Sequence, residues 1–272
     1  MTMITLSRIL RAAVLCALCP YSAPSAFAQA DPKPDPGQVR KEKEDHKAKV
    51  DEALKAFSDQ YKKAAGPDAQ AAAVKQHLGG DPKDARIVQR LAAILDGAPE
   101  PVLTAAAGAL ARYGNDPALA RGAASALGAA LDKYKTNETL AVMLCRALGD
   151  LGSDAGVPPL LKWIDDENLQ IARAAIEALG KIRAREGIPP LIKLALKVER
   201  GKVDLNFAPL TARGGAARAS GQQRYLFLYP LTIRMLASIT GQTFREATEW
   251  EDWWQKHGAT FTVPGKEPGA KR

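Results

Sequence analysis

The run GVPPLLK at residues 156–162 returns 31 residues later as GIPPLIK at residues 187–193. A second segment, ALGDL at 147–151, returns at the same offset as ALGKI at 178–182. Two separate segments that share one period indicate an internal structural repeat. A single repeat of this size cannot bury its apolar face alone, so the period predicts a stack of repeats with a shared core.

The residue types of the repeats predict helices. Paired prolines can open a helix, because the missing N–H has no intrahelical partner in the first turn. Ala and Gly let neighbouring helices approach closely, and Leu and Ile at helical spacing can fill the core between them. No stretch alternates with a period of two over β-branched residues, so no sheet is expected. We expect helices near residues 68–78, 83–96, 99–113, 117–134, 137–151, 156–166, 168–183, 187–199, 223–240 and 246–257.

These repeated segments resemble HEAT repeats, particularly the short bacterial repeats related to those of phycobilisome lyases. The likeness is strongest over Gly156–Ile182 and Gly187–Leu196, and weaker copies extend it across residues 83–240. It implies an all-α fold, an α-α superhelix (HEAT-like solenoid), which we place at residues 50–258 with a C-terminal capping helix. It also implies a protein that binds other proteins.

The turn inside the repeat departs from the HEAT pattern. Such repeats place an arginine directly after the Val or Ile that opens the second helix, and this arginine bonds to an aspartate of the turn. Here Ala172 follows Ile171, and the arginine stands one position later, at Arg173. The resemblance therefore leaves open whether Asp165 or Asp166 bonds to an arginine of its own repeat.

The segment at residues 1–28 has the pattern of a secretory signal peptide. Arg8 and Arg11 form a positive start, and Ala12–Leu18 is a short apolar core. The small residues of AFA at 26–28 suit a signal peptidase. The apolar core is too short to cross a membrane, and no run of about 18 apolar residues occurs elsewhere. We therefore predict a signal peptide at 1–28 that is cleaved, a periplasmic or secreted bacterial protein, and no membrane span.

Charge and cysteine content narrow the choice of partners. Cleavage would lower the net charge from +8 to +6, because the removed segment carries two arginines and no acidic residue. A pI near 9.4 is compatible with nucleic acid binding, but export and the mixed signs of charge argue against it. We expect instead an acidic protein partner or an anionic envelope surface. Only Cys145 would remain after cleavage, so no intramolecular disulfide is expected.

The segment at residues 29–49 is rich in proline and charge, and we expect it to be disordered or to project from the domain. Opposite charges recur at helical spacing from Gln38 to Lys63, which favours a helix over that range. An apolar stripe predicts that the second half of this helix docks on the domain. The stripe consists of Val50, Leu54, Phe57 and Tyr61.

The repeat period fails between Lys197 and Arg224. MLASI at 235–239 matches ALGKI at 178–182, but at almost twice the regular offset, so an insert separates the two segments. We place the insert at 199–224 and expect either a disordered loop or a loop that contacts an acidic partner. Arginine suits the second role, because its planar fork binds carboxylates through two hydrogen bonds. The candidate partner-binding residues of the insert are Lys202, Arg213, Arg218 and Arg224.

A tryptophan-rich helix is expected near the C-terminal end, at residues 246–257. It resembles the closing segment of exported bacterial HEAT-repeat proteins. Its shared face holds Trp250, Trp253, Trp254 and His257. This face can cap the open end of the solenoid, or it can stack on a ligand such as a sugar, which makes Trp250 a fifth candidate binding residue. The tail at 259–272 is basic, and we expect it to be disordered.

Catalytic and metal-binding patterns are absent from the sequence. The three histidines are scattered, and Cys145 aligns with Ile176 of the next repeat, which is a core position. No serine has the context of a nucleophile elbow, and no glycine pair belongs to a phosphate loop. We therefore expect no catalytic residues, no cofactor and no metal.

These observations favour an exported, non-enzymatic scaffold or adaptor that mediates protein–protein interaction through its solenoid surface. One alternative is an envelope ligand- or glycan-binding module that uses the tryptophans and the basic insert. Another is a lyase-like enzyme, by analogy with the phycobilisome lyases that the repeats resemble.

Overall fold

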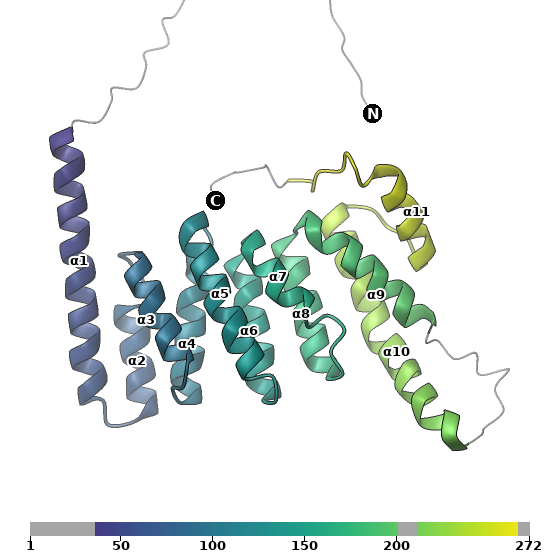
Figure 1. Ribbon diagram of the computed structural model, residues 1–272, viewed down its shortest axis with the longest axis horizontal. Coiled ribbons are helices and arrows are strands. Elements are labelled where there is room, and N and C mark those ends of the chain that lie inside the picture. The colour runs from purple at the N-terminus through teal and green to yellow at the C-terminus, as the bar shows by residue number, and fades with distance from the viewer. Residues whose placement is uncertain (1–35, 201–211, 266–272) are drawn as a thin grey trace, which may run out of the picture. The chain divides into compact units, whose positions relative to one another are not determined.

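The computed structural model describes residues 36–200 and 212–265 (Figure 1). The predicted signal peptide at 1–28, the candidate residue Lys202 and the end of the tail from residue 266 lie outside the described residues. The chain divides into two compact units, Met1–Glu42 and Lys43–Arg272. The described part of the first unit, Pro36–Glu42, is helical, and the description below concerns the second unit.

The fold is all-α, a HEAT-like superhelix, as predicted. Eleven α-helices and no strand occur among the described residues. The helices are α1 (Pro36–Lys63), α2 (Pro67–His77), α3 (Ala85–Leu95), α4 (Glu100–Leu110), α5 (Pro117–Lys133), α6 (Glu138–Leu151), α7 (Val157–Leu161), α8 (Leu169–Ile182), α9 (Ile188–Arg200), α10 (Ala212–Thr240) and α11 (Ala247–His257). Three single-turn 3₁₀ helices join them: η1 (Ala111–Tyr113), η2 (Asp154–Gly156) and η3 (Arg185–Gly187).

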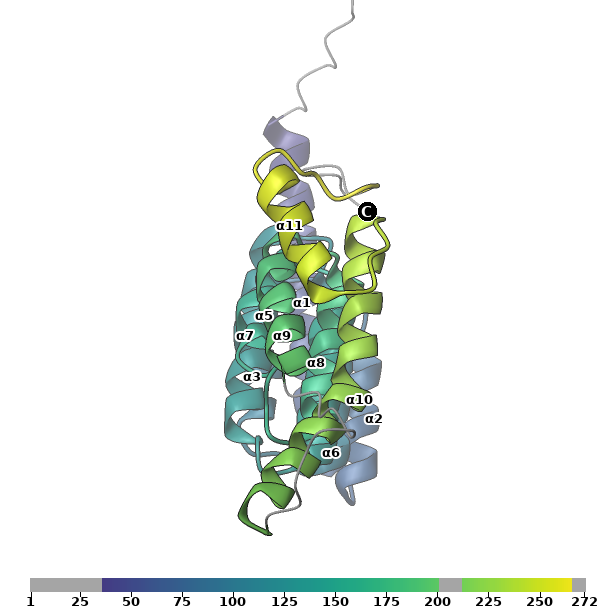
Figure 2. The same cartoon turned by 90° about the vertical axis from the view of Figure 1, so that its right-hand side faces the viewer.

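Consecutive helices pair, and the pairs stack in two layers. The pairs are α3 with α4, α5 with α6, α7 with α8, and α9 with α10. In one layer α2 packs on α4, α4 on α6, α6 on α8, and α8 on α10, while in the other α3 packs on α5 and α5 on α7. Figure 2 shows the even-numbered helices on one side and the odd-numbered helices on the other. The core lies between the layers and consists mainly of Leu, Ile, Val and Ala side chains.

The predicted role of the paired prolines is confirmed. Pro158 and Pro159 stand in the first turn of α7, and the run that contains Pro189 and Pro190 opens α9. The helix α7 is shorter than predicted: it ends at Leu161 and not near residue 166.

The caps of α6 and α8 follow the regular repeat offset. The Asn137 side chain accepts a hydrogen bond from the backbone N–H of Leu140 at 3.1 Å, and Asn168 accepts one from Gln170 at 2.9 Å. The residues after the two helices, Gly152 and Arg183, both have left-handed backbones with φ of 65° and 53°. An N-cap of this kind stabilises a helix by about 1 kcal/mol.

Two glycines allow close contact between helices of the even-numbered layer. A Cβ at Gly149 of α6 would lie 2.9 Å from the Cα of Ala178 in α8, and a Cβ at Gly180 of α8 would collide with Met235 of α10. Gly180 corresponds to Gly149, and Met235 corresponds to Ala178 in the repeat alignment. The same contact therefore recurs across the insert, so α10 occupies the position of the next repeat.

The insert is more helical than the sequence predicts. The helix α9 continues to Arg200, and α10 begins at Ala212 rather than near residue 223. The stretch from Ala212 to Arg224 is rich in Ala, Arg and Gln, which favour helices. It also contains the pair Gly214–Gly215, and this pair led to the prediction of a loop. The expectation of a loop across 199–224 is therefore wrong for both ends of that range.

The predicted docking of the second half of α1 is confirmed. Val50 and Phe57 are buried, and Leu54 and Tyr61 are partly buried against the core. The side chains of Lys43–Lys49 are exposed. Docking thus begins at the first residue of the apolar stripe.

The domain extends past residue 258. Phe261 packs edge-on against Trp253, with 5.3 Å between ring centroids, and Val263 is buried. The Arg183 guanidinium donates a hydrogen bond to the backbone oxygen of Pro264 at 2.8 Å. The boundary predicted between residues 258 and 259 is therefore too early.

Candidate protein-interaction surface

The outward side chains of α6, α8 and α10 form a regular array. The regular offset from α6 to α8, and the longer offset from α8 to α10, align four exposed or partly exposed positions on each helix. We call these twelve residues the even-helix face. They are Thr139, Val142, Arg146 and Asp150 of α6; Gln170, Arg173, Glu177 and Lys181 of α8; and Phe227, Pro230, Arg234 and Ser238 of α10.

Ion pairs fix part of this face. Lys181 pairs with Asp150, which occupies the equivalent position of the preceding repeat. Arg173 Nε bonds to Glu177 Oε1 at 2.9 Å, and the Arg173 guanidinium lies 5.7 Å from the centre of the Phe227 ring. These contacts neutralise the middle of the face and orient its side chains.

Two arginines of the face differ from these paired residues. Arg146 and Arg234 are both exposed. Neither has an ion-pair or hydrogen-bond partner among the side chains that the structure describes. The even-helix face therefore presents two guanidinium groups that can bind an external anion.

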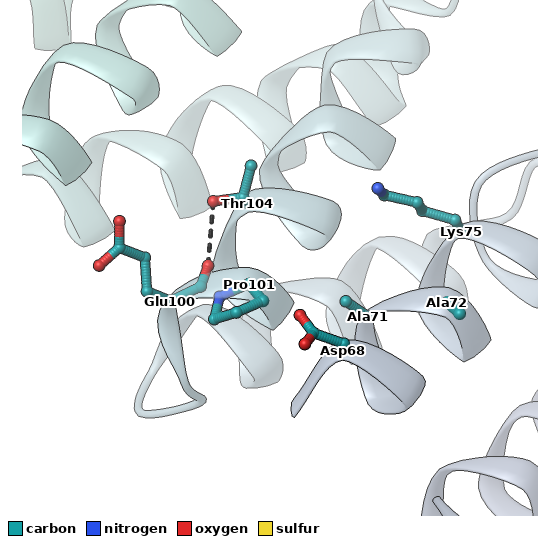
Figure 3. A pocket seen from close by; sticks show the side chains of 7 residues that line it. All are labelled: Asp68, Ala71, Ala72, Lys75, Glu100, Pro101 and Thr104. Atoms are coloured by element: carbon teal, nitrogen blue, oxygen red, sulfur yellow. Dashed lines mark hydrogen bonds between the residues drawn. The ribbon is translucent and has the colours of Figure 1, made fainter. Parts of the chain in front are cut away.

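At the N-terminal end of the same layer, the surface is hollowed and is not a regular array of side chains. A shallow hollow of about 590 Å³ lies between α2 and α4 (Figure 3). Thr104 at its edge donates its hydroxyl to the Glu100 backbone oxygen at 2.9 Å. Asp68 and Glu100 stand in the first turns of their helices, where a carboxylate stabilises the helix dipole. The hollow is lined by Asp68, Ala71, Ala72, Lys75, Glu100, Pro101 and Thr104.

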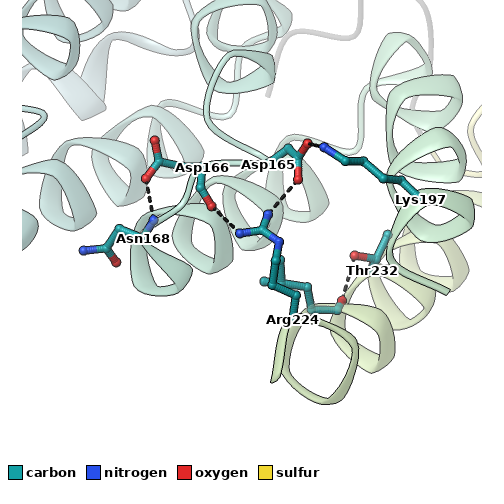
Figure 4. Close-up of polar contacts among 7 residues, drawn as sticks. Asp165, Asp166, Asn168, Lys197, Arg224 and Thr232 are labelled. Carbon is teal, nitrogen blue, oxygen red and sulfur yellow. Dashed lines mark hydrogen bonds and ion pairs between the residues drawn. The ribbon is translucent and has the colours of Figure 1, made fainter. Parts of the chain in front are cut away.

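The candidate residue Arg224 is bound inside the domain (Figure 4). Its guanidinium donates to the Asp166 backbone oxygen at 2.8 Å and to Asp165 Oδ1 at 2.6 Å. Lys197 pairs with the other carboxylate oxygen of Asp165. The side chain of Arg224 is 23% exposed, so its main contact is with the turn before α8.

This network answers the question left open by the departure from the HEAT pattern. Arg173 turns to Glu177 instead of the preceding turn, and Asp166 accepts a hydrogen bond from the Asn168 backbone at 2.8 Å. The arginine that binds the turn comes from α10. It therefore ties the helix after the insert to the repeat before it.

Lysine–aspartate pairs also link successive repeats on the other side of the stack. Lys133 bonds to Asp96 at 2.7 Å, and Lys162 bonds to Asp132 at 2.9 Å. The hydrogen bond from Lys133 lowers the pKa of Asp96. Because these pairs are largely exposed, each contributes little to stability.

The candidate residue Trp250 is buried in the cap of the domain. Its side chain has no exposed surface, and its Nε1–H donates to the Phe244 backbone oxygen at 3.3 Å. The Phe244 ring meets it edge-on at 4.9 Å between centroids. The helix α11, which carries Trp250, packs on α9. This position fits the capping interpretation, and it keeps the indole away from any ligand.

The other predicted candidates lie in α10 or beyond the described chain. Arg213 and Arg218 belong to the first turns of α10. None of the five predicted candidates is part of the even-helix face. Sequence reasoning missed Arg146 and Arg234, although the offsets that align them with Glu177 were present in the repeat.

Cys145 is the cysteine that the structure describes, and it is buried. Burial raises the pKa of the Cys145 thiol to about 12, so the thiol stays protonated and unreactive. In the described ranges no group of three or more His, Cys, Asp or Glu side chains could hold a metal ion. None of the helices described is long and apolar enough to cross a membrane.

Comparison with known proteins supports the repeat assignment. A family model of HEAT repeats matches residues 124–203. That range begins within α5 and includes the two best copies of the repeat. In a comparison with curated proteins, no match was found. The match supports a HEAT-repeat protein, and HEAT repeats suggest a scaffold for protein interaction.

Proposed function

We propose that this protein is an exported, non-enzymatic scaffold that holds a partner protein on its even-helix face. The observation that carries the proposal is the alignment of twelve exposed or partly exposed side chains on three successive helices. Two of them, Arg146 and Arg234, lack a partner in the described part of the chain.

The mechanism is recognition by a preformed surface. The Asp150–Lys181 and Arg173–Glu177 pairs hold side chains in place before binding. Binding therefore costs less conformational entropy than binding to a mobile loop would, because these side chains are already ordered. The close contacts at Gly149 and Gly180 hold α6, α8 and α10 against one another.

The export part of the proposal rests on the segment at 1–28. Its positive start, short apolar core and small residues at 26–28 suit a signal peptide. The mature chain would begin at Gln29 and act in the periplasm or outside the cell. Mass spectrometry of the N-terminal peptide of the protein purified from its native cells tests this, and an intact Met1 would refute it.

Site-specific photocrosslinking tests the scaffold role. A photoreactive amino acid replaces Thr139 on the even-helix face, and in a control it replaces Lys193, an exposed residue of α9. We expect a discrete crosslinked partner from position 139 in intact cells, and none from position 193. Equal labelling from both positions, or no adduct from position 139, would contradict the proposal.

A further inference from the structure

The partner segment can be described from the geometry of the even-helix face, given that this face is the binding surface as proposed above. Arg146 on α6 and Arg234 on α10 occupy the same level of the stack. The contacts of Gly149 with Ala178 and of Gly180 with Met235 fix that level. Packed helix axes lie about 8–10 Å apart, and α8 lies between α6 and α10. The axes of α6 and α10, which carry the two arginines, are therefore separated by roughly 16–20 Å.

The surface between the two arginines is electrically balanced. Glu177 stands between them on α8 and is already bonded to Arg173 at 2.9 Å. The two rows on the N-terminal side of these arginines include Val142 and Phe227, which are partly buried and offer apolar contact. A ligand that fits this pattern has an anion at each end and an uncharged, partly apolar middle.

An extended peptide meets these requirements at a definite spacing. Because an extended chain advances about 3.3–3.6 Å per residue, a span of this length corresponds to roughly five or six residues. Each arginine can bind a carboxylate through two parallel N–H···O bonds. We propose that the even-helix face binds an extended acidic segment of a protein partner, crossing α6, α8 and α10, in which two Asp or Glu residues stand six positions apart and so point to the same side of the chain.

Nucleic acid fits the same surface less well. A continuous polyanion would place phosphates next to Glu177 and Asp150 as well as next to the arginines. Four cationic and two anionic side chains share the face: Arg146, Arg173, Lys181 and Arg234, with Asp150 and Glu177. The alternation of sign thus favours separated carboxylates.

Fluorescence anisotropy with synthetic peptides tests this inference on the full chain. The peptides are labelled Gly/Ser/Leu frames that carry two glutamates separated by two to ten positions. We expect the tightest binding at a separation of six, and at least several-fold weaker binding at two and at ten. Binding should also weaken as salt is raised, because both arginines are exposed.

Variants assign the effect to the two arginines. Arg146→Ala and Arg234→Ala should each reduce binding about tenfold, since a lost charged hydrogen-bonding contact of this kind contributes about 1.5 kcal/mol or more. The variants should then bind the two-glutamate peptide no better than a peptide with one glutamate. Lys193→Ala removes an exposed cation from α9 and should leave binding unchanged. All three residues are exposed, so the variants should keep their fold. Unchanged thermal unfolding would confirm this.

Three results would overturn the inference. They are equal binding at all glutamate spacings, binding that survives in Arg146→Ala/Arg234→Ala, and an arginine-dependent affinity for a 20-base-pair DNA duplex above that for every peptide. The crosslinking experiment separates this inference from the proposed function. A partner crosslinked at position 139 together with flat peptide binding leaves the scaffold role intact and removes only the acidic segment.

Discussion

The interface between α6 and α8 and the interface between α8 and α10 make the same contact in different settings. The first joins adjacent repeats, with Gly149 against Ala178, and the second joins repeats separated by the insert, with Gly180 against Met235. In the first, the exposed Asp150–Lys181 pair crosses between the helices. In the second, the half-buried Arg224 binds the turn before α8. Packing at the glycine positions of α6 and α8 therefore sets the register of the repeats, and the number of residues in the connection does not.

The largest effect is expected at the C-terminal end of the stack, where a cap replaces the next repeat. The helices α6 and α8 have neighbours on both sides, whereas α9 is covered by α11 through the buried Trp250. Trp250→Ala should lower the free energy of unfolding by about 4 kcal/mol, because it empties a large core position. Hydrogen exchange should show the loss of protection in α9 to α11 before α6 and α8.

Trp253→Ala is the matched control for this variant. Trp253 is only partly buried, so its loss should cost clearly less than the loss of Trp250. Equal destabilisation by the two substitutions, or protection lost uniformly along the chain, would show that α11 is not a separate cap.

A second prediction compares the two glycine contacts directly. Gly149→Ala places a methyl group against the backbone of Ala178, so α6 and α8 must separate, and we expect a loss of about 2 kcal/mol. Gly180→Ala meets the flexible end of the Met235 side chain, which can rotate away. Urea unfolding of both variants should therefore give a much smaller loss for Gly180→Ala, and the reverse order would show that the Met235 side chain cannot move aside.

The regular part of the fold could be predicted from the sequence because the same residue types recur at a fixed offset in two repeats. The prolines of α7 and α9 and the glycines of α6 and α8 keep one offset, and the structure confirms their roles. The start of α10 was missed because Gly214 and Gly215 are poor helix formers in isolation. The tail from Phe261 to Pro264 was missed because its contacts come from distant aromatic and arginine side chains.

The candidate surface was harder to predict than the fold. A cluster of arginines in an irregular segment drew attention to Arg213, Arg218 and Arg224, although Arg224 binds Asp165 within the domain. Arg146 and Arg234 lie outside this cluster, in segments that match the regular repeats. Their relation appears only when α10 is aligned with α8 across the insert. The match of MLASI at 235–239 with ALGKI at 178–182 contains that alignment, but only the packing of α6, α8 and α10 shows that the aligned residues share one face.

The smallest expected effect decides between a structural and a partner-binding role for Arg224. Arg224→Ala removes two charged hydrogen bonds, at 2.8 and 2.6 Å, from a side chain that is 23% exposed. We expect a loss of about 1–2 kcal/mol in urea unfolding.

Lys181→Ala is the control, because it removes a comparable ion pair at an exposed position of the regular repeats. It should change stability by no more than about 0.5 kcal/mol. Peptide binding to the even-helix face should persist in Arg224→Ala, since this arginine is not one of the twelve residues of the face. If Arg224→Ala proved as stable as Lys181→Ala and lost the acidic peptide, the arginine would serve the partner, and the link across the insert would rest on the Gly180–Met235 contact alone.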